Sequence, residues 1–264
     1  MGGRPALYRL KPSPDLHVPG LAFPLLLALL IAPDSDSGST PRLVAEERME
    51  FSVDYKGVRL GKAQLFLGHA DGSVIPAFLQ TRTTGVASII TIRQQLSSQL
   101  DRHTGLPRST ALEAVEGGYR HSNTAAFDRV RNKATVRRRG SKSDKTWVLD
   151  VPPGTVDFLA LVYQLRQLPL DTGSRHPFDV LAGRNLAHIE TEVAGREQVS
   201  TGIGKVPAVK VRVPTSFEGE FQEKNPTFIW FSDDARRIIV RISADFAIGR
   251  ATATLISYSP GDAG

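Results

Sequence analysis

The sequence predicts a mainly β protein, built as a large antiparallel curved sheet or half-open barrel with one amphipathic helix. Segments rich in aliphatic and aromatic residues follow one another from residue 46 onward, with short turn sequences between them. Within many of them apolar and polar residues alternate. Only 158–168 repeats apolar residues with helical spacing. Many short strands at even spacing favour an antiparallel sandwich or barrel over alternating βαβ units.

The first expected strand is 49–55, in which apolar residues occupy every second position. Gly57 then turns the chain into a second strand, 60–67, where Gly61 leaves room for a close neighbour. The further expected strands are 73–84, 88–100, 108–116, 118–127, 130–138, 145–151, 186–194, 195–203, 206–213, 226–232, 236–244 and 247–258.

The expected helix begins after Pro152-Pro153-Gly154, where Thr155 and Asp157 can accept hydrogen bonds from the first free N–H groups. Pro169 ends it. Its apolar residues form one stripe, which predicts packing against the sheet. The stripe consists of Phe158, Leu161, Val162, Leu165 and Leu168.

Two strand-like segments flank Ser232-Asp233-Asp234, which is typical of a β-hairpin. The adjacent carboxylates also suggest a metal or acid–base site. A calcium site needs six to eight oxygen ligands, however, and no D-x-D-x-D-G loop is present. Asp side chains have strong local reasons to lie in turns, so we favour the turn, with Arg236 or Arg237 as an ion-pair partner.

The formal net charge of +6 is concentrated in residues 129–145, which hold eight basic residues and one acidic residue. We consider contact with an anionic membrane surface through Arg131, Lys133, Arg137, Arg138, Arg139 and Lys142. The alternative, which we favour, is a solvated hairpin whose charges protect an exposed sheet edge. Binding to nucleic acid is not expected, because the segment has no aromatic stacking platform.

The N-terminal sequence predicts export to the periplasm. Basic residues precede a twelve-residue apolar run, 21–32, and a small polar segment follows it, as in a Sec-type signal peptide. We therefore expect a signal peptide at 1–37, a linker at 38–45 and a single domain at 46–260. The sequence contains no cysteine, which excludes disulfides and lipid attachment at a cysteine.

No motif predicts catalysis. The five histidines beyond residue 37 show no H-E-x-x-H spacing, and G-x-S-x-G, P-loop and dinucleotide motifs are absent. A catalytic set can still assemble from distant residues, because such sets are defined by geometry. We therefore do not favour an enzyme, and we expect no cofactor.

Several short motifs occur in a characteristic order: Tyr55-Lys56-Gly57-Val58-Arg59-Leu60-Gly61, the helix 157–166, Gly195-Arg196-Glu197 and Trp230-Phe231-Ser232-Asp233-Asp234. Their succession over 46–258 resembles the bacterial exported family catalogued as domain of unknown function 3108. One departure is Ile239, where that family has proline. The marker residues of the resemblance are Gly57, Gly61, Asp157, Tyr163, Arg166, Glu197, Trp230, Ser232, Asp233 and Asp234.

The resemblance implies an exported β protein without an assigned activity, similar in outline to the half-open barrels of periplasmic lipoprotein carriers. Our leading hypothesis is a cell-envelope protein that binds an apolar ligand, such as a lipid or acyl chain, in a curved sheet. The alternative is a structural module that scaffolds other envelope proteins. A hollow interior would favour the first and a packed interior the second.

Overall fold

A computed structural model of the chain describes residues 43–84, 92–116, 119–140, 143–217, 220–246 and 249–261. The expected signal peptide and most of the expected linker lie outside this part of the chain. The strands are β1 (Arg48–Tyr55), β2 (Val58–Leu67), β3 (Val74–Thr83), β4 (Ile92–Asp101), β5 (Pro107–Glu116), β6 (Tyr119–Asp128), β7 (Lys133–Gly140), β8 (Ser143–Asp150), β9 (Arg175–Ala182), β10 (Asn185–Thr201), β11 (Gly204–Phe217), β12 (Glu220–Ser232), β13 (Ile239–Phe246) and β14 (Gly249–Ser259).

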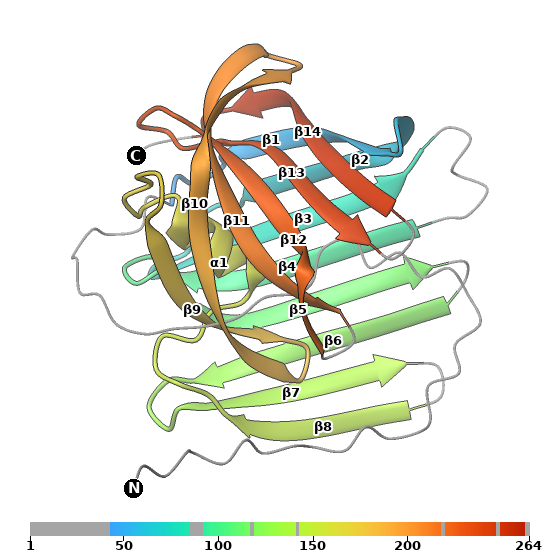
Figure 1. Cartoon of the computed structure of the whole chain (residues 1–264). Coiled ribbons are helices and arrows are strands. Elements are labelled where there is room, and N and C mark those ends of the chain that lie inside the picture. Colours follow the sequence, from blue (N-terminus) through green and yellow to red (C-terminus); the bar gives the residue numbers. More distant parts are fainter. Residues whose placement is uncertain are drawn as a thin grey trace, which may run out of the picture.

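All fourteen strands form one antiparallel sheet, in the order β8-β7-β6-β5-β4-β3-β2-β1-β14-β13-β12-β11-β10-β9. The chain runs in consecutive hairpins from β1 out to β8, then crosses to the other edge and returns through β9 to β14 (Figure 1). β1 and β14 pair inside the sheet, with Arg48 opposite Ser259. β8 and β9 are the two edges, so the sheet is curved and not closed. The predicted fold class is confirmed.

The helix α1 (Phe158–Leu165) lies in the crossover and contacts β3, β4 and β9. Asp157 caps it by accepting a hydrogen bond from the Ala160 N–H at 2.8 Å. Seven of its eight residues are buried, because both arms of the curved sheet face it (Figure 1). The helix ends at Leu165, with Arg166 as its C-cap, so Leu168 is not part of it.

The sheet has an apolar inner face and a polar outer face. On β2, β3 and β4, Leu65, Leu79 and Leu96 lie in register and belong to the same buried cluster as α1. Strand side chains alternate between faces, so their sequence neighbours Gln64, Gln80 and Gln95 lie on the outer face. A second buried cluster, with Ala125, Ala134, Val136, Val151 and Leu181, lies near the open edge.

The structure corrects three strand assignments. The expected strands 186–194 and 195–203 are one strand, β10, because Gly195 (φ +148°) is accommodated by a register shift against β11. β9 was not predicted, and β13 begins at Ile239 rather than at residue 236. The first residues of the expected strand 88–100 lie outside the described ranges. In the described part of the chain, no helix is long and apolar enough to cross a membrane.

Candidate functional site

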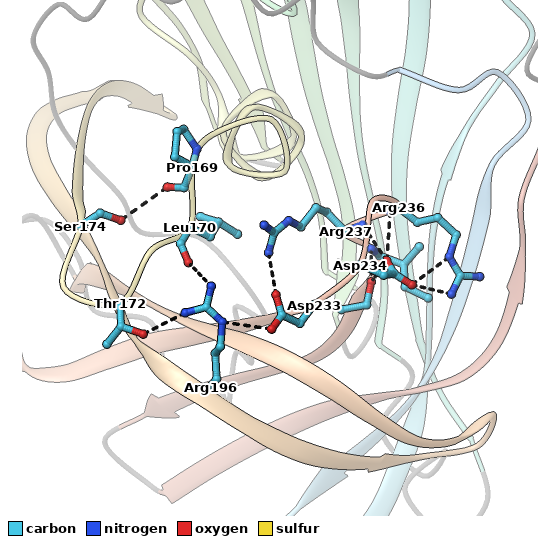
Figure 2. Close-up of polar contacts among 11 residues, drawn as sticks. Pro169, Leu170, Thr172, Ser174, Arg196, Asp233, Asp234, Arg236 and Arg237 are labelled. Atoms are coloured by element: carbon cyan, nitrogen blue, oxygen red, sulfur yellow. Dashed lines mark hydrogen bonds and ion pairs between the residues drawn. The ribbon is translucent and has the colours of Figure 1, made fainter.

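The predicted turn around Asp234 forms between β12 and β13. Asp234 Oδ1 accepts hydrogen bonds from the Ser232 hydroxyl at 2.8 Å and the Arg236 backbone N–H at 3.0 Å. The Arg236 guanidinium binds Oδ2 through Nη2 at 2.6 Å and Nε at 3.0 Å (Figure 2). Ser232 Oγ in turn accepts from the buried Ile238 N–H. Burial raises the pKa of Asp234, but the hydrogen bonds from Arg236 and Ser232 outweigh it and lower the pKa.

Asp233 points away from this turn toward β10. Its carboxylate accepts from Arg196 Nε at 3.0 Å and lies 3.5 Å from Arg237 Nη1 (Figure 2). Arg196 also donates to the Thr172 hydroxyl and the Leu170 carbonyl, and so ties the segment after α1 to the hairpin. Both carboxylates are therefore neutralised by arginine. Among the described residues, no group of acidic and histidine side chains has metal-binding geometry.

Trp230 belongs to the main buried cluster and connects four strands of the sheet. Its indole N–H donates to the Glu197 carboxylate, and the Lys210 ammonium lies 5.1 Å from the ring centroid. The Arg241 guanidinium lies 5.8 Å from the centroid of the same ring. Only 6% of Trp230 is exposed. The contacts join β10, β11, β12 and β13. Trp230 and Glu197 thus have a packing role that the sequence did not specify.

Arg166 forms a buried polar cluster with Glu47, and its guanidinium lies 5.3 Å from the ring centroid of the buried Tyr163. Arg166 Nη1 and Nη2 donate to the two Glu47 carboxylate oxygens at 2.6 and 2.7 Å, and both side chains are almost completely buried. Tyr258 donates to the same carboxylate at 3.2 Å, and Arg166 donates to the Arg236 carbonyl. Burial raises the pKa of Tyr258 to about 12. This buried ion pair and its hydrogen bonds join the end of α1 to β14 and to the residue that precedes β1.

Asp157 is buried, and burial raises its pKa, against the hydrogen bond from the Ala160 N–H. Arg129 lies close enough for its charge to interact with Asp157, and burial lowers the pKa of Arg129 to about 10. Arg129 Nη2 donates to the Pro107 carbonyl at 2.6 Å, and the guanidinium lies 4.4 Å from the Phe127 ring centroid. These contacts favour a structural role for both charges.

Two glycine markers have backbone explanations. Gly57 has φ +81° in the β1–β2 turn, a conformation that side chains with a Cβ disfavour. A Cβ at Gly61 would lie 2.1 Å from the Arg82 carbonyl oxygen, so β2 and β3 could not keep their spacing. Gly61 is required by this close approach.

The basic residues proposed to touch an anionic surface lie on the hairpin β7–β8 and in the turn before it. Four of the six are paired with aspartates: Arg131–Asp128, Lys133–Asp150, Arg137–Asp144 and Arg139–Asp144. Arg138 is exposed, and Lys142 lies outside the described residues. Because β8 is an edge strand, this arrangement agrees with the alternative that the charges protect a sheet edge.

A polar hollow of about 1260 Å³ crosses the outer face of β1 to β7. Its walls are two rows of side chains that run across the strands. In the first row Gln64, Gln80 and Gln95 lie directly opposite one another on β2, β3 and β4. Glu50 on β1 and Glu113 on β5 flank them, and the row continues through Ser122 to Arg139 on β7. We call this hollow the transverse groove.

The second wall of the transverse groove is basic. Lys62, Arg82 and Arg93 lie directly opposite one another, and the row continues through Val115 on β5 to Arg120 on β6. The residues between the two walls, such as Ala63 and Ala114, belong by alternation to the inner face, so they give the groove a backbone floor. Five basic and two acidic side chains line the groove, a net charge of +3.

A family model described as "Protein of unknown function (DUF3108)" matches residues 50–256. The chain belongs to the DUF3108 family. A β-barrel-like protein of domain of unknown function DUF1849 from Brucella abortus has a similar fold, with a TM-score of 0.57 and 11% identity. That match covers 89% of this DUF3108 chain and 100% of the other. A DUF1089 family protein from Pseudomonas aeruginosa matches at a TM-score of 0.36 and 11% identity, over 67% of this chain and 87% of the other. No protein with a curated description matches.

Two features of this DUF3108 chain were missed in the sequence. Glu47 lies outside every motif, although an acidic residue just before the first strand could have been matched to the arginine that ends the helix. The groove depends on the register of strands that are separated by turns. The spacing of Gln64, Gln80 and Gln95 is a signal only once that register is known.

Proposed function

We propose that this protein is a non-catalytic binding protein of the cell envelope that holds its ligand in the transverse groove. The observation that carries the proposal is the hollow of about 1260 Å³, larger than the roughly 300–1,000 Å³ of common small-molecule sites. An extended ligand would suit such a volume. The apolar segment 21–32 supports export. Among the described residues, both Asp233 and Asp234 are bound by arginine, which disfavours catalysis at that hairpin.

A blocked groove tests this proposal. In Gln80→Trp/Gln95→Trp two large rings would fill the space between the walls. The purified proteins would be incubated with envelope extract and washed. Native mass spectrometry would then detect any retained ligand, either a small molecule or a short polymer. Thr135→Trp is a matched control, because Thr135 is exposed on the same sheet face and does not line the groove. We expect the wild type and the control to retain a ligand that the blocked variant loses. Equal retention by all three would contradict the proposal.

An apolar ligand such as a lipid or acyl chain is the second candidate. The described interior around α1 is filled, because Leu159, Leu161 and Leu165 are completely buried. The apolar surface that supports this candidate lies near the open edge, where the half-buried Trp147 and Leu149 pack on the second buried cluster. Extraction with organic solvent followed by mass spectrometry should then recover an apolar molecule. Its amount should fall in Trp147→Gln and stay unchanged in the blocked-groove variant.

Scaffolding of other envelope proteins is the alternative to ligand binding. The filled interior around α1 supports it, since a packed core needs no ligand. Cross-linking in intact envelopes would then give the same partner proteins for the wild type and for the blocked-groove variant. Contact of the β7–β8 hairpin with an anionic membrane surface also remains a proposal. It predicts that vesicles with anionic lipid bind less well to Arg138→Gln.

A further inference from the structure

We infer that the ligand of the transverse groove is an anionic polysaccharide, an inference that rests on the proposed function. The first support is the charge of the basic wall. Lys62, Arg82 and Arg93 are exposed and face one another across neighbouring strands, and like charges in that relation destabilise a sheet. None of these three, nor Arg120, forms an ion pair with another described residue.

Several other cations of the sheet lie next to acidic partners. Arg137 lies beside Asp144, Lys133 opposite Asp150, and Arg175 near Glu190. Arg138 and Lys145 also lie opposite each other with no ion pair to another described residue, so the basic wall is distinguished by lining a hollow. Its repulsion would be relieved by a ligand that carries several negative charges. Three of the four residues are arginines, whose guanidinium groups match carboxylate, sulfate or phosphate oxygens with two hydrogen bonds.

The amide wall indicates what else the ligand carries. Gln80 Nε2 donates to Gln95 Oε1 at 2.9 Å, and Gln64 Nε2 donates to Glu50 Oε1 at 2.9 Å. These bonds orient the amides, which keep further donors and acceptors for hydroxyl groups. No phenylalanine, tyrosine or tryptophan lines the groove among the described residues, so bases would lack the large stacking rings of single-strand binding proteins there. Hydroxyl groups and repeated negative charges occur together in an anionic polysaccharide.

The repeat of the sheet favours a linear chain. Neighbouring strands such as β2, β3 and β4 (Figure 1) lie about 4.7–4.9 Å apart. A polymer that crosses these three strands would meet one amide and one cation at every strand. The groups lie on two walls with a backbone floor between them. A chain can enter such a hollow, whereas the head groups of a bilayer form a surface too broad to reach the floor. We therefore favour the polysaccharide over a membrane.

Binding of defined polymers tests the inference. Polygalacturonate, heparin and uncharged dextran would be titrated into the full chain by isothermal calorimetry at low and physiological salt. We expect the two anionic polysaccharides to bind, with affinity that falls as salt rises, and dextran not to bind. In Arg82→Gln/Arg93→Gln the affinity should fall at least tenfold. Lys133→Gln/Arg137→Gln is the matched control, because it removes the same charge from the same face outside the groove. It should bind like the wild type.

Folding of the variants is checked separately. Removing two facing arginines relieves repulsion, so the melting temperature of Arg82→Gln/Arg93→Gln should equal or exceed that of the wild type. The inference would be overturned by equal losses in both double variants, by tight binding of dextran, or by groove-dependent binding only to single-stranded DNA or to vesicles of phosphatidylglycerol. If the blocked-groove variant loses its envelope ligand but no polysaccharide binds the wild type, the groove stands and the ligand class falls. If polysaccharides bind the wild type and the blocked-groove variant equally, both the proposed function and the proposed ligand class fall.

Discussion

Arg166→Met should destabilise the protein by about 3–5 kcal/mol, the usual range when one partner of a buried ion pair is removed. Methionine keeps much of the apolar length of the arginine and removes its charge and donors. The Glu47 carboxylate, of which 1% is exposed, would lose both short hydrogen bonds and keep only that from Tyr258. The Arg236 carbonyl would also lose a donor.

The expected loss of stability is large because water cannot reach the buried Glu47 carboxylate to replace Arg166. A control is Arg175→Met, which breaks the exposed pair with Glu190 at 2.9 Å and should change the free energy of unfolding by only about 0–1 kcal/mol. A double variant, Glu47→Leu/Arg166→Met, leaves no buried charge. It should be more stable than Arg166→Met alone, even though Tyr258 loses a hydrogen-bond partner.

Urea denaturation followed by tryptophan fluorescence measures these differences, because the chain has two tryptophans, Trp147 and Trp230. The urea concentrations at the midpoints of unfolding can be compared directly where the variants share the same slope of unfolding free energy against urea concentration. A loss below about 1 kcal/mol in Arg166→Met would refute the reasoning, since the pair would then behave as an exposed one. The reasoning would also be refuted if the double variant lost as much stability as Glu47→Leu and Arg166→Met lose together when each is made alone.

Three further predictions concern other described contacts. Gly61→Ala should cost about 1–3 kcal/mol in urea denaturation, because the new Cβ overlaps the Arg82 carbonyl; a stability equal to the wild type would mean that β2 and β3 separate freely. Asp157→Asn keeps the helix cap and should remove a pH dependence. Burial raises the pKa of Asp157 in the folded state, so the wild type loses stability as pH rises above the ordinary value of 3.8, and melting curves from pH 4 to 8 should converge only at the acidic end. Ser232→Ala should cost about 1–3 kcal/mol, because the buried Ile238 N–H loses its acceptor, and faster amide exchange at Ile238 would report that loss.

Sequence periodicity predicted most of the sheet because half-buried strands alternate. β9 escaped because residues 178–181 are all buried, and because Pro177 lies opposite Glu190 in an edge strand. The other side of β9 forms backbone hydrogen bonds with Val156. Gly195 suggested a break, but a glycine in a long strand can also accommodate a bulge. The Ser232–Asp234 turn followed from local chemistry, and its ion pair with Arg236 was predicted.

The site was less accessible to prediction. Arg166 and Glu47 are separated by 119 residues, and their pairing depends on where α1 packs. Lys62, Arg82 and Arg93 become a row only through the register of three strands, which turn geometry sets. The basic run 129–145 was identified by its charge density in the sequence, yet four of its eight basic residues are paired with aspartates. The unpaired cations of the groove, in contrast, are dispersed along the chain.

The pairing of β1 with β14 has a consequence for the order of folding. Every other neighbouring pair in the sheet joins strands consecutive in sequence, whereas this seam brings together residues such as Glu47 and Tyr258, which are 211 positions apart. Two halves can therefore form early from nearby contacts, and the seam must bear the entropy of closing the longest loop. A circular permutant with its old ends joined and its new ends between β8 and β9 would turn the sheet into one continuous meander. Its slowest folding step should then be faster.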